Sequence, residues 1–326
     1  MAKTTITRDD IHLVSRNSNA TVPDIKTAFE RNGIYAGKAV WRRFLHFFLI
    51  GLGLAFVVAG ILFFFAFNWA NLHKFAKLGL IEGLLVACVA IVLLRKRLDE
   101  KIKNILLSAA AMLVGVLFAV FGQIYQTGAD AYDLFLGWTA AILLWTIVSG
   151  FPVLWLIFMI LCNTTLCLYA GQVANIDTPV LLTLLFLLNT CFVVLTVLAG
   201  RQKWTEEPTQ WLSGLATTIA VTCITIAVCT SILDHHRSSL AFSFPLAIAG
   251  FAAGILYGFR SRNLLYLAEI PFAILLILVT LIIKPFHDPI GTFFLISILI
   301  IGCTTLLIVQ LVKLNKRWHE DGAERN

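Results

Sequence analysis

The sequence ILLSAAAMLVGVLFAVFGQIYQ occupies residues 105–126 and contains no charged side chain. As an α-helix it would be about 33 Å long at 1.5 Å per residue, slightly more than the ~30 Å hydrocarbon core of a bilayer. The apolar run is continuous, whereas the strands of a membrane barrel alternate in polarity over about 10 residues. This stretch therefore predicts a transmembrane helix.

The composition of the whole chain supports the same fold class. Hydrophobic residues make up 59% of the 326 residues and charged residues 13%. A soluble domain contains about 25% charged and 45–50% apolar residues, because its surface faces water. No polar stretch is longer than the first 43 residues, which excludes a nucleotide-binding or hydrolase domain of ordinary size. We also find no phosphate-binding loop, dinucleotide fingerprint or Cys-x-x-Cys motif.

Ten apolar runs are long enough to cross a bilayer, so we predict an all-α polytopic transmembrane bundle. The predicted spans are 44–67, 78–94, 105–126, 133–149, 151–170, 179–199, 212–233, 240–259, 264–283 and 290–312. Together they form a predicted bundle of residues 44–313. The fourth and fifth spans of this bundle are separated only by residues 149–152. Gly150 and Pro152 favour a tight turn there, so we keep them as two spans.

The distribution of basic residues predicts the orientation. With ten spans both termini lie on one side of the membrane, and 21 of the 25 Lys and Arg residues fall on that side. The positive-inside rule assigns it to the cytoplasm. We therefore expect a multi-pass protein of the bacterial inner membrane, with a short cytoplasmic tail at 314–326. The net charge of +7 then reports orientation, and we expect no nucleic-acid partner.

Residues 1–43 are expected to form a cytoplasmic segment with two short helices. Thr7 with Asp10 resembles a weak capping box, and Thr21 with Asp24 marks a second helix start. The basic residues beside the bilayer favour docking on the membrane surface, since each contributes ~1 kcal/mol against anionic lipid. Binding of a protein partner is the alternative.

One face of the 105–126 span combines packing and polar residues. Ala111, Gly115 and Ala119 recur every four residues, a spacing that allows another helix to approach closely. Polar side chains follow at the outer end of the span and are candidates to border a cavity: Gln123, Tyr125, Gln126 and Asp130. An unpaired amide in hydrocarbon costs several kcal/mol, so Gln123 must face another helix or a watery cavity.

The same stretch carries a resemblance to a known family. Residues 121–126 (FGQIYQ), Gly128-Ala129-Asp130, Leu134-Phe135 and Trp138 are similar to the hallmark of a bacterial membrane family, domain of unknown function 2157. Asn68-Trp69, just after the first span, resembles it too and adds two cavity candidates. The resemblance covers roughly residues 8–145. It implies a many-spanning membrane protein and implies no activity.

Two carboxylates lie within predicted spans and are candidates for carrying a coupling proton. Glu82 lies near the outer surface in the second span, and Glu269 lies near the cytoplasmic surface in the ninth. A charge at the bilayer centre costs about 2.5–3.5 kcal/mol, and less near its edges. The alternative is a carboxylate that reaches the interface or a neighbouring donor. Pro271 predicts a kink beside Glu269.

Gly250, Gly254 and Gly258 form a second small-residue face, in the eighth span. It favours tight helix packing or self-association, and a sliding surface is the alternative. All seven cysteines lie in apolar runs, where they act as small packing residues. We expect no metal site and no cofactor.

Three functions are compatible with these features. The first is a secondary transporter or permease for a small molecule or lipid, with a cavity near Gln123 and a coupling proton on Glu82 or Glu269. The second is a non-transporting scaffold or assembly factor, which would bind a second copy or another membrane protein through its glycine faces and basic N-terminal segment. An intramembrane enzyme is the least favoured, because the chain lacks a His-Glu-x-x-His motif.

Overall fold

The computed structural model describes residues 21–31, 38–68, 71–95, 99–126, 128, 130–201, 210–234, 237–284 and 289–323. The chain forms two compact units, residues 1–73 and 74–326, and each is described by itself. Within the described residues all the regular elements are helices, which confirms the predicted all-α class.

The first unit contains α2 (Val22–Arg31) and α3 (Lys38–Asn68). Asp24 Oδ2 accepts hydrogen bonds from the Thr21 backbone amide (3.0 Å) and the Thr21 hydroxyl, so the predicted helix start is present. These two bonds lower the pKa of the Asp24 carboxyl below its usual value. The first predicted helix, near Thr7 and Asp10, lies outside the described residues.

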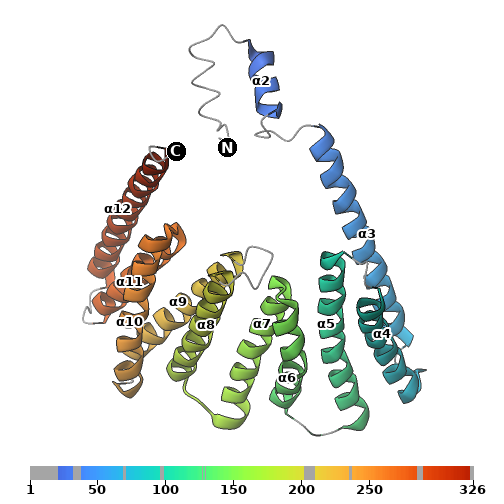
Figure 1. The fold of residues 1–326 in the computed structure, drawn as a ribbon. Helices are drawn as coiled ribbons and strands as arrows, with labels where there is room; N and C mark the ends of the chain where they lie inside the picture. The colour runs from blue at the N-terminus through green and yellow to red at the C-terminus, as the bar shows by residue number, and fades with distance from the viewer. Residues whose placement is uncertain are drawn as a thin grey trace. The chain divides into compact units, whose positions relative to one another are not determined.

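The second unit is a series of consecutive helices that run antiparallel and pack beside one another (Figure 1). Their bounds are α4 (Lys74–Leu94), α5 (Glu100–Tyr125), α6 (Ala131–Ser149), α7 (Pro152–Tyr169) with the π-helical turn η2 (Ala170–Ala174), α8 (Thr178–Arg201), α9 (Gln210–Leu233), α10 (Arg237–Ser261), α11 (Leu264–Ile283) and α12 (Pro289–Ala323).

Among the described residues, nine helices, all in this unit, are long and apolar enough to cross a membrane. They coincide with nine of the ten predicted spans, including the two that we separated at residues 149–152. Gly150 ends α6 with a φ of 58°, and Pro152 is the first residue of α7. The one remaining predicted span, the first in the chain at 44–67, lies inside α3.

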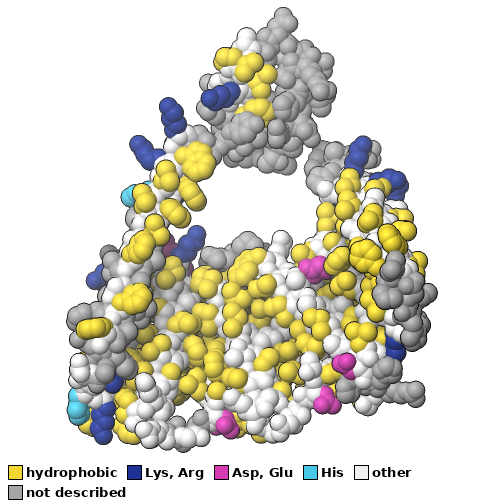
Figure 2. Space-filling model, turned by 180° about the vertical axis from the view of Figure 1, so that it is seen from behind, with side chains coloured by type: hydrophobic (Ala, Val, Ile, Leu, Met, Phe, Trp, Pro, Cys, Tyr) yellow, Lys and Arg dark blue, Asp and Glu magenta, His cyan; other side chains and the backbone are white. Residues whose placement is uncertain are grey.

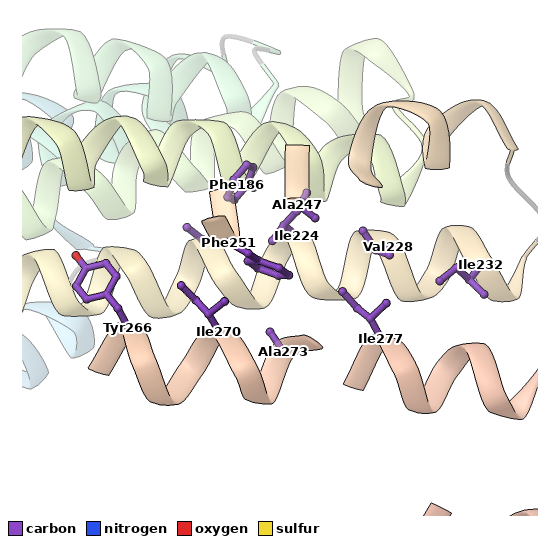
Figure 3. Packing of buried hydrophobic residues seen from close by; sticks show 11 residues of the cluster. Phe186, Ile224, Val228, Ile232, Ala247, Phe251, Tyr266, Ile270, Ala273 and Ile277 are labelled. Atoms are coloured by element: carbon purple, nitrogen blue, oxygen red, sulfur yellow. The ribbon is translucent and has the colours of Figure 1, made fainter. Parts of the chain in front are cut away.

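The core of the second unit is centred on α9, which contacts α8, α10 and α11. Figure 3 shows Ile224, Val228 and Ile232 of α9 in one layer with Ile270 and Ile277 of α11. Burying a side chain of this size contributes roughly 1.5–3 kcal/mol relative to water, but lipid is as apolar as the core. Packing inside the bilayer is therefore stabilised mainly by close contacts and hydrogen bonds between helices.

The remaining helix faces are apolar and exposed, as expected of surfaces that face lipid. Hydrophobic side chains cover most of the helical surface visible in Figure 2. The helices α4 and α12 are the least buried of the nine candidate spans, whereas α9 is the most buried. The second unit therefore has its best-packed region in α8–α11.

Candidate functional site

Glu269 of α11 lies in a groove between α9 and α11, and the two oxygens of its carboxylate have different surroundings. Oε1 accepts a 2.5 Å hydrogen bond from the Thr218 hydroxyl. Oε2 is buried and has no hydrogen-bond partner among the described residues. A buried carboxylate oxygen without a partner is costly, so this group is a candidate functional residue.

The groove has a volume of about 370 Å³ and a largely apolar surface. Thr218, Thr222 and Thr225 contribute to its α9 side, spaced so that they share one helix face. The α11 side carries Glu269, Phe272 and Ala273. Pro271 lies within α11 and provides no backbone donor to the Leu267 carbonyl one turn earlier. The glutamate therefore lies where its helix is weakened.

A second cavity, of about 280 Å³, lies among α8, α9, α10 and α11. Phe186, Val193 and Val197 of α8 are part of its wall, opposite Gly250 and Gly254 of α10. Val194 and Leu198 at its rim are exposed, so the cavity opens toward the lipid-facing surface. None of the described residues that line it is charged.

The polar atoms at this cavity are hydroxyls that bond to one another. Thr217 of α9 donates to the Tyr266 hydroxyl of α11 over 3.0 Å, and Ser213 lies 3.2 Å from the same oxygen. Tyr257 of α10 meets the Tyr266 ring edge-on at 5.1 Å. The cavity thus offers an apolar wall with a hydroxyl group at one side. Neutral or amphipathic molecules fit this chemistry.

The glycine face predicted in the eighth span is used inside the chain. A Cβ at Gly250 would lie 2.7 Å from Phe186, and one at Gly254 would lie 2.5 Å from Ile270. At Gly258 a Cβ would be 3.0 Å from Tyr266 and 3.1 Å from Leu267. The absence of side chains at these positions lets α10 pack closely against α8 and α11.

The small-residue face of the third span packs on α6. A Cβ at Gly115 would overlap the indole of Trp138, and Trp138 Nε1 donates to the Ala111 carbonyl over 2.7 Å. The contact covers only part of the face, since Ala119 and Gln123 are exposed within the second unit. The two helices therefore separate toward the last residues of α5 and the first residues of α6.

A groove of about 420 Å³ lies where α5 and α6 separate. Gln126 and Asp130 line it, so the structure brings together these two of the predicted cavity residues. Gln126 ends α5 in the left-handed conformation with a φ of 44°, and Asp130 precedes α6 without capping it through its side chain. The cap comes instead from Gln172 of η2, whose Oε1 accepts from the Tyr132 amide at 3.0 Å.

The other predicted residues are placed elsewhere. Gln123 and Tyr125 do not line the groove. The Tyr125 ring lies 6.0 Å from the Lys74 ammonium group, and its centre is 4.6 Å from that of the Phe121 ring, with the two rings tilted by 41°. Glu82 is exposed on α4, far along the chain from Glu269 and not in the same groove. Asn68 is the last residue of α3, its side chain lies outside the described set, and so does the whole of Trp69.

An amide pair that we did not single out links α7 and α8. Asn163 and Asn189 exchange two hydrogen bonds, of 3.2 and 2.6 Å, and each also donates to a carbonyl of its own helix. Asn189 is fully buried. Both residues interrupt apolar runs, and that signal was available in the sequence. The partner of each could only come from the structure.

Groups of His, Cys, Asp and Glu placed to hold a metal ion do not occur among the described residues. Residues 235, 236, 287 and 288, which include three of the histidines, lie outside that set. The sites above therefore offer hydroxyls, the carboxylates of Glu269, Asp130 and Asp133, the amide of Gln126 and apolar walls.

Residues 35–155 match the model of a family described as Predicted membrane protein (DUF2157). This confirms the resemblance predicted from residues 121–138 and from Asn68-Trp69, over a range that includes α3, α4, α5 and α6. The match begins after the polar N-terminal lead that the predicted resemblance had included. No curated protein and no solved structure matches the chain. The chain is thus a membrane protein with multiple apolar helices, and both the α8–α11 cavity and Glu269 lie beyond the matched residues.

Proposed function

We propose that this chain is a secondary transporter of the bacterial inner membrane that moves a small neutral or amphipathic molecule, such as a lipid. The observation that carries the proposal is the cavity among α8, α9, α10 and α11. Binding pockets for small molecules are mainly apolar, with a few polar groups that fix orientation. The hydroxyl cluster around Tyr266 would supply such groups.

The chemistry of the wall defines the substrate class. A charged ligand would lose its hydration in this cavity without gaining a counter-ion, at a cost of several kcal/mol. An apolar chain that enters from the lipid has no hydration to lose. A hydroxyl or carbonyl group attached to that chain would form a hydrogen bond near Tyr266. The volume suits a small molecule or one part of a lipid, such as a single chain.

Movement, rather than static binding, is favoured by the helices that form the cavity. Proline interrupts α10 at Pro245 and α11 at Pro271. Each proline leaves one carbonyl of its helix without its usual donor and weakens the helix there. Glycines face the cavity from α10, and such small-residue contacts allow one helix to shift against another.

A scaffold function has less support from the packing. We expected a scaffold to bind its partners through the glycine faces. Those glycines are covered by side chains of this same chain: Gly115, Gly250, Gly254 and Gly258. A scaffold would then depend on the N-terminal segment alone.

The test is a flux measurement with the full chain reconstituted in liposomes. Two probes are used: a fluorescent glucosylceramide, whose head group is uncharged and whose transfer between leaflets is followed by dithionite quenching, and ethidium, whose entry is followed by fluorescence. We expect transfer of the lipid probe above the rate of empty liposomes, and no protein-dependent entry of the cationic ethidium.

A pair of neighbouring substitutions on α10 provides the control. Both alanines are exposed, but Ala253 lines the cavity and the adjacent Ala252 does not. Ala253→Phe should abolish the protein-dependent lipid transfer, and Ala252→Phe should leave it intact. Failure of the wild-type chain to move the lipid probe, or equal rates in the two variants, would overturn the proposal.

A further inference from the structure

Among the described residues two buried side-chain oxygens have no hydrogen-bond partner, Ser243 Oγ and Glu269 Oε2, and only the second belongs to an ionisable group. Glu269 lies about 8 Å along α11 from its first residue, at ~1.5 Å per residue. Its Oε1 bonds to Thr218, but its Oε2 is buried and accepts nothing from the described residues. Ionised carboxylates accept hydrogen bonds through both oxygens, so this environment is poorly suited to the charged form.

Among the residues that the structure describes, no cation lines the groove to balance a charge on Glu269. The other groove residues are threonines and apolar side chains. Helix α9, which forms the opposite wall, has no charged residue or histidine, and its ionisable side chains are the thiols of Cys223 and Cys229. Other charged or titratable groups lie at the cytoplasmic ends of α10 and α12 and in the α10–α11 turn, and they do not line the groove. They are Tyr257, Arg260, Arg262, Lys313, Lys316 and Arg317.

The Thr218 hydroxyl has two acceptors within reach and only one hydrogen. Its Oγ lies 2.5 Å from Glu269 Oε1 and 3.1 Å from the carbonyl oxygen of Gly214, one turn earlier in α9. When the carboxylate is ionised, the hydroxyl must donate to Glu269. When the carboxyl is protonated, Glu269 can donate to Thr218 Oγ, and the hydroxyl hydrogen is then free to bond to Gly214.

We propose that Glu269 is a proton-binding site, and that the bound proton transfers the Thr218 hydroxyl from the carboxylate to the Gly214 carbonyl. The protonated state forms a continuous series of hydrogen bonds from α11 to the backbone of α9. It also replaces a buried charge by a neutral carbonyl at Oε2. Loss of the proton to water leaves a charge that draws water into the groove of about 370 Å³.

The consequence is a contact between α9 and α11 that depends on protonation. The same two helices form the wall of the neighbouring cavity, because Val221 of α9 lines both spaces. Protonation would therefore favour a closed α9–α11 pair, and deprotonation a hydrated one. The use of this proton to drive substrate movement rests on the proposed function, but the binding site itself does not.

The test is infrared difference spectroscopy of the purified full chain in lipid without any substrate, recorded between about pH 9 and about pH 6, above the range in which exposed carboxyl groups protonate. A protonated carboxyl group absorbs in a region separate from amide groups. We expect a carboxylic C=O band that appears on acidification, is lost in Glu269→Gln and is retained in Glu82→Gln, whose carboxyl is exposed.

Two threonine variants test the exchange of the hydroxyl. Thr218→Val removes the hydroxyl with little change in shape, and should shift the C=O band to higher frequency because the carboxyl loses its hydrogen bond. Thr222→Val removes a hydroxyl from the same groove that has no bond to Glu269, and should leave the band unchanged.

The outcomes separate the site from the transport proposal. A band that survives in Glu269→Gln, or that is equally affected by both threonine variants, overturns the proton site. If the band behaves as expected but transfer of the lipid probe does not depend on pH, the site stands and its coupling role is rejected. Absence of any lipid transfer bears only on the proposed function, since the spectra need no substrate.

Discussion

The amide pair between α7 and α8 provides a quantitative test of the packing. Asn163 and Asn189 share two hydrogen bonds across the helix interface, and Asn189 is fully buried. Replacing one residue by leucine removes both bonds and leaves an amide facing an apolar side chain. Replacing both restores a uniform apolar contact, so the double variant should be less destabilised than the sum of the single variants.

The expected coupling follows from the number of bonds. Hydrogen bonds between membrane helices contribute ~0.6 kcal/mol on average and up to ~1.7 kcal/mol. Two bonds give a coupling free energy of about 1–3 kcal/mol. Each amide also donates to a carbonyl of its own helix, Met159 or Leu185, which moderates the loss in the single variants.

The assay is reversible unfolding of the chain in mixed micelles by titration with dodecyl sulfate, followed by circular dichroism. The wild type, Asn163→Leu, Asn189→Leu and the double variant complete a double-mutant cycle. The matched control is the cycle for Thr139 and Thr165, whose hydroxyls lie 3.4 Å apart in the α6–α7 interface and should couple weakly. A coupling below ~0.5 kcal/mol for the asparagines, or no larger than that of the threonines, would refute the argument.

Three further predictions follow from contacts described above. Gly254→Leu should lower the unfolding free energy by about 1–3 kcal/mol in the same titration because it overpacks α10 against α11, whereas Gly302→Leu, with no atoms near its added Cβ, should have little effect. Gln172→Ala should cost ~1 kcal/mol and speed hydrogen exchange at the Tyr132 amide, since the start of α6 loses its acceptor; unchanged exchange would contradict the cap. Asp24→Asn should speed exchange in α2 at neutral pH. Because folding lowers the pKa of Asp24, its contribution is complete above the unfolded value and is lost as the pH falls through the folded value, so the two proteins should converge in acid.

The sequence was sufficient for the elements themselves. Length and continuity of apolar runs predicted the helices of the second unit, and the turn at Gly150 and Pro152 was predicted from two residues. These features are local: a helix in lipid satisfies its own backbone, so its existence depends on its own residues. The orientation from basic residues and the placement of the N-terminal segment stay predictions.

The candidate site was predicted only in part. Glu269 was identified because a carboxylate within an apolar run is costly, and Gly250 and Gly254 because of their spacing. The sequence did not indicate that Thr218 would be the donor to Glu269, that Gln172 would cap α6, or that Tyr266 would form a hydroxyl cluster with Thr217. Each of these contacts joins residues about 40 or more positions apart in the chain.

Hydrophobicity and charge by themselves determined that this chain forms helices that cross a membrane. The tertiary structure alone decided which helix faces meet, that Gln123 and Glu82 are exposed within their unit, and that an apolar cavity lies among α8–α11. The physical reason is that lipid and protein interior are equally apolar, so a membrane helix carries little amphipathic pattern to tell its buried face from its outer one. Partners are selected by fine packing and by single hydrogen bonds, and these exist only once the helices are assembled.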